Sequence, residues 1–357
     1  MDNKKTYKIL TVLLVMQWAF LRIIAQYPAA IEKYYSNGFY IYISKFLSLF
    51  FGWIPFSFGD ILYVIIAIVI IINIYIAIKN RKLHFKNTFF KIGGFISILF
   101  FIFHLNWGLN YFRQPVYKNL NFENEKYADN DLLDLTERLI VKTNHIQLSI
   151  TKNDSIVVEN ALNKSQIKEV SYTVYKQFQD KYPQFYHENL KVKHSLFSVP
   201  LTYMGFAGYL NPLTNEAQVN SLIPKNNYPM IVCHELAHQV GIASESEANF
   251  IGYLASTNAD DVYFNYSGYL MALRFCLFEI FQNDPAKFEL LKIKLNKGVL
   301  KDIQNTENFW ESYQNWSEKY FKTFYDTFLK ANKQTDGIKG YNKVVVLLVN
   351  YHKNKEF

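Results

Sequence analysis

The chain contains 357 residues, enough for two or three structural units, and a soluble part of more than 200 residues can bury a full core. Half of the residues are hydrophobic and only 19% are charged, less than in a typical soluble domain, and the apolar surplus lies mainly before residue 113. The net charge of +8 gathers beside apolar runs, as it does at the cytoplasmic flanks of membrane helices. We therefore expect a membrane protein that does not bind nucleic acid.

Three apolar runs near the N-terminus have the length of membrane spans. They cover residues 9–25, 61–78 and 92–107. About 20 apolar residues in a helix cross the roughly 30 Å hydrocarbon core of a bilayer. The first run follows several lysines and could be a signal peptide, but it is long for one and lacks a clear cleavage site. We interpret all three runs as retained transmembrane helices.

Residues 39–57 are also apolar and aromatic, but a lysine, a glycine and a proline interrupt them. We interpret this stretch as an interfacial or re-entrant segment, with a fourth span as the alternative, because Trp and Tyr favour the headgroup region. Lysines at the N-terminus and a basic loop at 79–91 place both regions in the cytoplasm. The third span then places residues 113–357 on the extracytoplasmic side.

The region from residue 113 onward is predicted to be mostly helical. Apolar residues recur at helical spacing between 130 and 183, whereas YLNPLTNEAQVNSL, residues 209–222, is typical of a β hairpin. Further helices are expected at 228–240, from 244 onward, and at 266–282, 285–300, 307–332 and 341–351. The fold class is thus N-terminal transmembrane helices followed by a mainly α-helical domain with a small β hairpin or sheet.

The segment HELAH, residues 234–238, carries the chemistry of the candidate site. Two histidines four residues apart lie on one face of a helix, where both can bind one zinc ion. His234 and His238 are therefore predicted as metal ligands. Glu235 would stand beside the metal as the general base that takes a proton from water. Gly241 is well placed to end this helix.

The segment ESEAN, residues 245–249, offers a third ligand. Glu245 and Asn249 are four residues apart on one helix face, so Glu245 can bind zinc while Asn249 hydrogen-bonds one of the ligands. Glu247 is the alternative ligand, although it also fits a capping box with Ser244, and we favour Glu245. Four tyrosines are candidate oxyanion donors: Tyr203, Tyr209, Tyr266 and Tyr269.

HELAH followed by ESEAN resembles the gluzincin-type zinc peptidases, which carry HExxH and a glutamate in an E-x-x-A-[DN] segment. More closely, the chain resembles an uncharacterised bacterial family of membrane proteins that is known as a domain of unknown function. The similar segments are WGLNY at 107–111, PFSFGD at 55–60, and the stretches 208–224, 234–249 and 328–348. The resemblance implies a zincin-like fold for the helical domain and a zinc site, with the 208–220 hairpin lining a peptidase cleft. The gap of six residues between His238 and Glu245 is short for a gluzincin.

These observations predict a zinc metallopeptidase with several membrane spans in the bacterial inner membrane, with its catalytic domain on the periplasmic side and a peptide or protein as substrate. The alternative is a non-catalytic membrane sensor or scaffold with a structural zinc site, which four protein ligands would close. The apolar run around HELAH is too short for a protease that cuts within the bilayer. The substrate, the oligomeric state and the pairing of Cys233 with Cys276 stay open.

Overall fold

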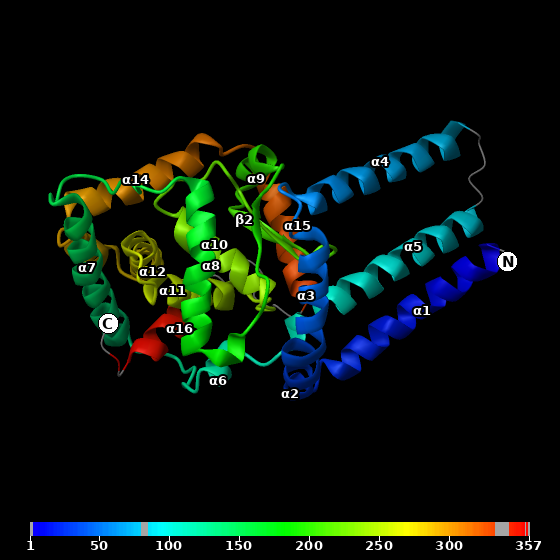
Figure 1. The fold of residues 1–357 in the computed structure, drawn as a ribbon, viewed down its shortest axis with the longest axis horizontal. Helices are drawn as coiled ribbons and strands as arrows, with labels where there is room; N and C mark the ends of the chain where they lie inside the picture. Colours follow the sequence, from blue (N-terminus) through cyan, green and yellow to red (C-terminus); the bar gives the residue numbers. More distant parts are fainter. Residues whose placement is uncertain (1–2, 80–84, 333–342, 354, 356–357) are drawn as a thin grey trace. The chain divides into compact units, whose positions relative to one another are not determined.

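The computed structural model describes residues 3–79, 85–332, 343–353 and 355. It is mainly helical and contains one small three-stranded sheet, as the sequence predicts (Figure 1). The chain divides into two compact units. We call residues 1–114 together with 211–216 the N-terminal unit, and residues 115–210 together with 217–357 the C-terminal unit.

The N-terminal unit holds the apolar helices. Its elements are α1 (Asn3–Ile24), α2 (Pro28–Ala30), the π-helix η1 (Ile31–Phe39), α3 (Tyr40–Phe51), α4 (Phe58–Lys79), α5 (Phe85–Asn106) and the 3-10 helix η2 (Gly108–Phe112). Of these, α1, α4 and α5 are long and apolar enough to cross a membrane, which indicates a membrane protein. Their apolar side chains are mostly exposed, as side chains in contact with lipid would be.

Helix α1 packs along α5 (Figure 1). The predicted interfacial segment forms α3, which continues from η1 and exposes aromatic side chains such as Tyr42 and Phe46. This helix is not among the three candidate spans of the described residues. In the predicted cytoplasmic loop at 79–91, residues 80–84 lie outside the described part of the chain.

Buried polar side chains join the ends of the N-terminal unit's helices. Arg113 makes two hydrogen bonds to Glu32, Nη2 to Oε1 at 2.6 Å and Nε to Oε2 at 2.8 Å. Glu216 accepts backbone N–H bonds from Phe58 at 3.2 Å and Gly59 at 2.6 Å. A carboxylate at a helix N-terminus satisfies free N–H groups and complements the helix dipole. The PFSFGD segment thus forms the start of α4, and Glu216 of the 211–216 turn caps it.

In its described residues, the C-terminal unit contains ten helices of seven residues or more and most of the sheet. Its elements are α6 (Val116–Asn119), α7 (Asp129–Thr151), α8 (Lys164–Lys181), η3 (Pro183–Phe185), β1 (Val192–His194), α9 (Ser198–Met204), β2 (Gly208–Asn211), β3 (Glu216–Val219), α10 (Tyr228–Gln239), α11 (Glu245–Thr257), α12 (Val262–Asn283), α13 (Pro285–Lys292), α14 (Lys297–Ser312), α15 (Glu318–Ala331) and α16 (Lys343–His352). The hairpin tip, Asn211–Glu216, groups with the N-terminal unit.

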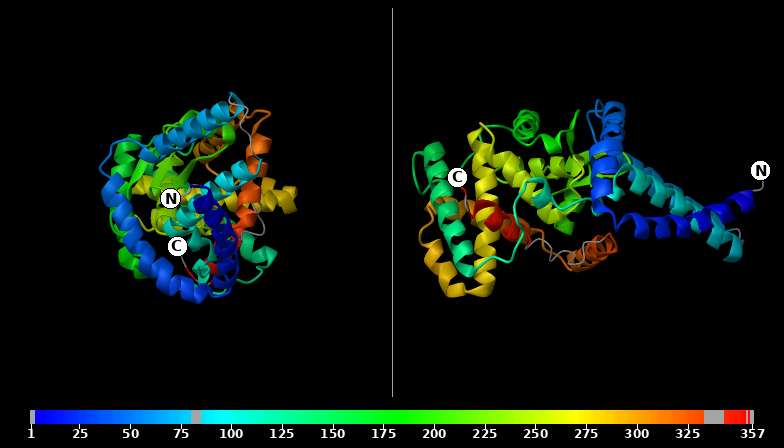
Figure 2. Two further views of the ribbon diagram at one scale, coloured as in Figure 1. Left: turned by 90° about the vertical axis from the view of Figure 1, so that its right-hand side faces the viewer. Right: turned by 90° about the horizontal axis from the view of Figure 1, so that it is seen from below.

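The strand order is β1-β3-β2, with β1 parallel to β3. The predicted hairpin corresponds to β2 and β3, whereas the short strand β1 was not predicted. Helices α7, α12 and α16 pack against one another, as Figure 1 and the right-hand view of Figure 2 show. Helix α11 packs between α10 and α12, so the two helices that carry the candidate site lie in the hydrophobic core.

Two predicted helices were wrong in their bounds. The predicted helix 285–300 is divided into α13 and α14, because Asn296 precedes α14 and its side chain bonds to Asn144 and Gln147 of α7. The predicted helix 307–332 is interrupted between α14 and α15, where the Asn315 side chain accepts the backbone N–H of Ser317. Asparagine side chains compete with helical backbone bonds in this way. Of the predicted helix 341–351, the first two residues lie outside the described part.

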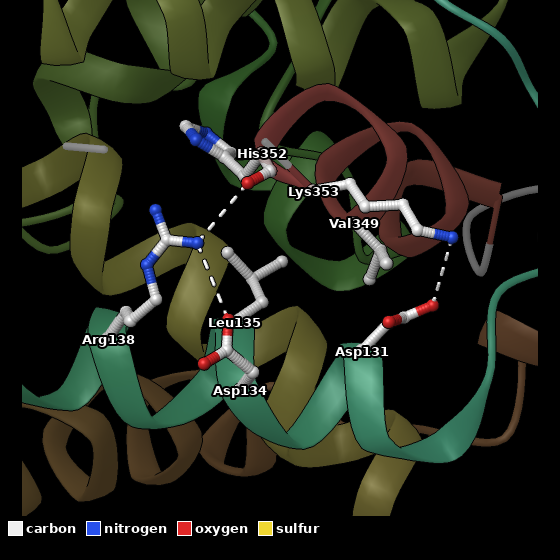
Figure 3. A pocket seen from close by; sticks show the side chains of 7 residues that line it. All are labelled: Asp131, Asp134, Leu135, Arg138, Val349, His352 and Lys353. Carbon is white, nitrogen blue, oxygen red and sulfur yellow. Dashed lines mark hydrogen bonds and ion pairs between the residues drawn. The ribbon is translucent and has the colours of Figure 1, made fainter. Parts of the chain in front are cut away.

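The C-terminal helix α16 is held on α7 by polar contacts around a small pocket (Figure 3). Arg138 of α7 donates to the backbone oxygen of His352 at 3.2 Å, and Lys353 pairs with Asp131 at 3.4 Å. The His352 ring lies in the protein interior, with Nε2 2.9 Å from the Tyr253 hydroxyl of α11. Burial, together with the charges of Arg138 and Lys355, lowers the pKa of His352 to about 3.

This burial predicts a loss of stability in mild acid. Unfolded His352 takes up a proton below about pH 6.5, whereas the folded state resists protonation down to about pH 3, so stability falls as the pH drops through this window. Between pH 7.5 and pH 5, the wild type should lose about 2 kcal/mol more than His352→Gln. Urea unfolding of the full chain in detergent would measure this difference. The exposed His145, changed to Gln, is the matched control and should behave as the wild type; equal losses in all three proteins would contradict the prediction.

Candidate metal centre

Helix α10 carries HELAH through the core of the C-terminal unit. All twelve of its residues are buried, so its two histidines and one glutamate are removed from bulk water. Gly241 follows the helix in the left-handed conformation, at φ 86°. The N–H groups of Gly241 and Ile242 donate to the carbonyl oxygens of His238 and Ala237, both at 3.0 Å, which is a Schellman motif. The predicted helix stop at Gly241 is therefore confirmed.

Three side-chain donors converge beside this helix. His234 Nε2 lies 3.1 Å from His238 Nε2, and the Glu245 Oε2 atom lies 3.3 Å from the first and 3.6 Å from the second. Zinc bonds of about 2.0–2.1 Å in a tetrahedron place neighbouring donors about 3.4 Å apart. The triangle of donors therefore has the dimensions of one face of a zinc site.

Hydrogen bonding orients one of the imidazoles toward this point. His238 Nδ1 lies 2.7 Å from the backbone oxygen of Ile242, to which it can only donate. In the neutral ring, this bond leaves the lone pair on Nε2, which is the tautomer that a metal ligand needs. The Schellman turn at Gly241 brings the Ile242 carbonyl to that position, so the helix stop and the ligand orientation share one cause.

Helix α11 supplies the third donor from its first residue, Glu245. The two helices approach closely at Gly252, where an added Cβ would lie 3.0 Å from the His234 nitrogen and 3.1 Å from its Cα. Gly252 is seven residues after Glu245, so both lie on the face of α11 that meets α10. The absent side chain at 252 thus permits the approach that places Glu245 against the histidines.

The side chain of Glu235 extends from α10 toward strand β2. It is 3% exposed, and its Oε2 finds no hydrogen-bond partner among the described residues. A Cβ on Gly208 would be 2.4 Å from Glu235 Oε1 and 2.5 Å from the Gln218 carbonyl oxygen. The backbone of β2 therefore passes directly over this carboxylate, and position 208 has room for glycine alone.

The charges of the site are strongly coupled. Burial raises the pKa of Glu235 to about 8. Burial also opposes ionisation of Glu245, but the two adjacent imidazoles outweigh it and hold the pKa of Glu245 well below its usual range. For His238, burial is outweighed by the Glu245 carboxylate, which raises the pKa to about 9. A cation held by the three donors would favour ionised Glu235 as well, because it would offset the second buried negative charge.

The other predicted residues of ESEAN have different surroundings. Glu247 accepts the backbone N–H of Val116 at 2.8 Å and is not part of the donor triangle. The predicted capping box is wrong for Ser244, whose side chain makes no cap hydrogen bond and lies 3.0 Å from the Ser246 hydroxyl. Asn249 is buried one turn after Glu245, and its side chain is close enough to His234 to oppose in part the lowering of that histidine's pKa by burial. Its role as a hydrogen-bonding partner of a ligand stays a prediction.

Sequence reasoning missed one residue of the site. Tyr325 of α15 donates its hydroxyl hydrogen bond to Glu245 Oε1. Among the tyrosines considered from sequence, Tyr266 instead donates to Asp302 at 2.7 Å, and Tyr203 packs on Tyr313 with 47% of its surface exposed. Tyr325 is 80 positions from Glu245 in a chain with 27 tyrosines, so no local signal could identify it.

The contact between Gly208 and Glu235 can be tested by stability alone. Gly208→Ala should lower the free energy of unfolding by about 1–3 kcal/mol, because overpacking forces the strand or the carboxylate to move. In a Glu235→Ala background the loss should be smaller, since one of the two clashes is gone. Urea unfolding of the two single variants and the double variant gives the coupling. Losses that add within about 0.5 kcal/mol would show that the two residues do not touch.

Comparison with known proteins places the chain in a family. The chain matches no curated protein and no solved structure. A family model does match residues 35–349, a range that includes the 211–216 turn and all three donors of the candidate metal centre. Because this range covers most of the chain, the protein belongs to the family described as Protein of unknown function (DUF3810).

Proposed function

We propose that the protein is a membrane-bound zinc peptidase of the gluzincin type. The observation that carries the proposal is the convergence of His234, His238 and Glu245 within 3.6 Å of one another, with Glu235 buried beside them. Two histidines and one carboxylate are the ligand set of several catalytic zinc sites in peptidases. The hard calcium and magnesium ions prefer oxygen ligands, so the two imidazoles favour zinc.

The number of ligands favours catalysis over a structural metal. Within the described residues, the group of side chains that could hold a metal ion contains three members. Structural zinc sites are usually closed by four protein ligands, whereas catalytic sites keep a position for water or substrate. Glu235 also favours catalysis. One oxygen of its buried carboxylate finds no hydrogen-bond partner among the described residues, and a structural zinc site would not need a second buried charge of this kind.

The residues divide the proposed reaction among them. A bound zinc ion would supply Lewis-acid polarisation and a lowered water pKa. Glu235 takes the proton of the attacking water as the C–O bond forms, and it returns that proton to the amide nitrogen as the C–N bond breaks. Gly208 keeps β2 close to Glu235, so water has little access from that side. The products are one carboxylate and one amine, and no other reactant is needed.

The placement of the protein in the cell extends this proposal. Three apolar helices support a protein with several spans in the bacterial inner membrane. The lysines at the N-terminus and the basic loop after α4 belong on the cytoplasmic side by the positive-inside rule. With α5 as the third span, the C-terminal unit lies on the periplasmic side and meets peptide or protein substrates there.

Substitutions separate the metal ligands from the base. His234→Ala, His238→Ala and Glu245→Gln should each reduce bound zinc well below one ion per chain, because the alanines remove an imidazole donor and a neutral amide is a poorer zinc ligand than a carboxylate. Glu235→Gln should keep the zinc and lose about 10²–10⁴ of the turnover, as expected for removal of a positioned base. Elemental analysis measures the metal, and mass spectrometry of a peptide library measures cleavage.

Glu247→Gln is the matched control for these variants, because Glu247 lies on the first turn of α11 outside the donor triangle. It should keep both zinc and turnover. Zinc loss in Glu247→Gln with zinc retained in Glu245→Gln would exchange the two glutamates. Full turnover in Glu235→Gln would contradict the role of Glu235 as the general base. No cleavage by the zinc-loaded wild type would favour a structural zinc site in a sensor or scaffold.

Reporter fusions test the orientation. Alkaline phosphatase, which is active only outside the cytoplasm, should be active when fused after residue 120 and inactive when fused at residue 85. A fluorescent cytoplasmic reporter should show the opposite pattern. Activity of both reporters in the reversed positions would overturn the orientation and the periplasmic location.

A further inference from the structure

Helix α15 contacts the candidate metal centre through the hydroxyl of Tyr325. The Tyr325 hydroxyl donates to Glu245 Oε1, whereas the other oxygen, Oε2, lies 3.3 Å and 3.6 Å from the two histidine Nε2 atoms. The two oxygens of one carboxylate therefore have separate partners. One is directed toward the donor triangle, and the other is occupied by a hydroxyl from a distant part of the chain.

The Glu245 side chain needs such a restraint more than the histidines do. It is the first residue of α11, where the helix backbone is fixed on one side only, and a glutamate loses up to about 2 kcal/mol of rotamer freedom when it is immobilised. A hydroxyl on Oε1 fixes the carboxylate plane and leaves Oε2 as the oxygen available to a metal. Hydrogen-bonding partners of ligands act in this way at many metal sites.

Packing holds Tyr325 in place for this contact. Its ring meets Phe206 edge to face at 5.1 Å, and Leu329, one turn later, is fully buried. The opposite side of α15 is open, with Phe324 74% exposed and Tyr320 59% exposed. Helix α15 packs on α9, and the face with Tyr325 meets the site.

We propose that Tyr325 is a positioning residue for the metal, which holds Glu245 with Oε2 toward the donor triangle and thereby raises the affinity for zinc. This inference rests on the metal centre of the proposed function. It predicts a role for the hydroxyl alone, because the phenyl ring of a phenylalanine would still pack on Phe206. The hydroxyl acts through Glu245, so its effect should vanish when that carboxylate is absent.

The test compares zinc affinity in full-length variants in detergent, measured by competition with a chromophoric chelator. Tyr325→Phe should bind zinc about 10–100-fold more weakly than the wild type, the usual loss for a hydrogen-bonding partner of a ligand. Tyr320→Phe, an exposed tyrosine five positions earlier on the same helix, is the matched control and should stay within about twofold. Thermal melts in excess chelator should show one cooperative transition for all three proteins, since the fold keeps its packing.

A second pair of variants separates positioning from a general structural effect. In a Glu245→Ala background, Tyr325→Phe should cause no further loss of zinc affinity, whereas a distortion of α15 would lower the affinity in both backgrounds. An affinity of Tyr325→Phe within about twofold of the wild type would overturn the positioning role and leave the metal centre intact. If His234→Ala binds zinc as tightly as the wild type, the metal centre is wrong, and the role of Tyr325 falls with it.

Discussion

The close approach of α10 and α11 at Gly252 is the constraint on which the candidate site depends. A Cβ at this position would lie 3.0–3.1 Å from the backbone of His234, so a larger residue would require the two helices to move apart by a few tenths of an ångström. The approach sets Glu245 against both imidazoles, although the glutamate lies on a separate helix. The Schellman turn at Gly241 makes the short connection between the helices and also presents the Ile242 carbonyl to His238.

This arrangement is costly for the stability of the fold. Two carboxylates and two imidazoles are buried together, and isolated buried charges carry a large desolvation penalty. Glu245 offsets part of the cost by pairing with the histidines, but Glu235 has one oxygen without a hydrogen-bond partner in the described part of the chain. Perturbed titratable groups of this kind gather at functional sites more often than in plain cores.

The β hairpin has residues in both compact units, so the chain itself connects the candidate metal centre to the N-terminal unit. Gly208 of β2 lies against Glu235 within the C-terminal unit, while Glu216, at the start of β3, caps α4 within the N-terminal unit. The WGLNY segment forms η2, where Asn110 accepts a hydrogen bond from Ser36 at 2.9 Å. The PFSFGD and WGLNY segments therefore have structural roles at the ends of helices.

The sequence by itself determined the features that depend on local periodicity. An apolar run of sufficient length defines a candidate span, and histidines four residues apart share a helix face, so α1, α4, α5 and the HELAH pair could be predicted without a partner helix. The free state of Cys233 and Cys276, by contrast, appears only in the structure, where both are buried.

The third donor, Glu245, could be predicted in part from the sequence. Glu245 and Glu247 differ by about 200° around α11, and Gly252 lies seven residues after the first and five after the second. A small residue marks the face on which two helices approach, and that face is the one with Glu245. The role of Tyr325 could not be predicted from the sequence, because its contact with Glu245 joins residues 80 positions apart. Only the packing of α15 on α9 decides which of 27 tyrosines meets the carboxylate.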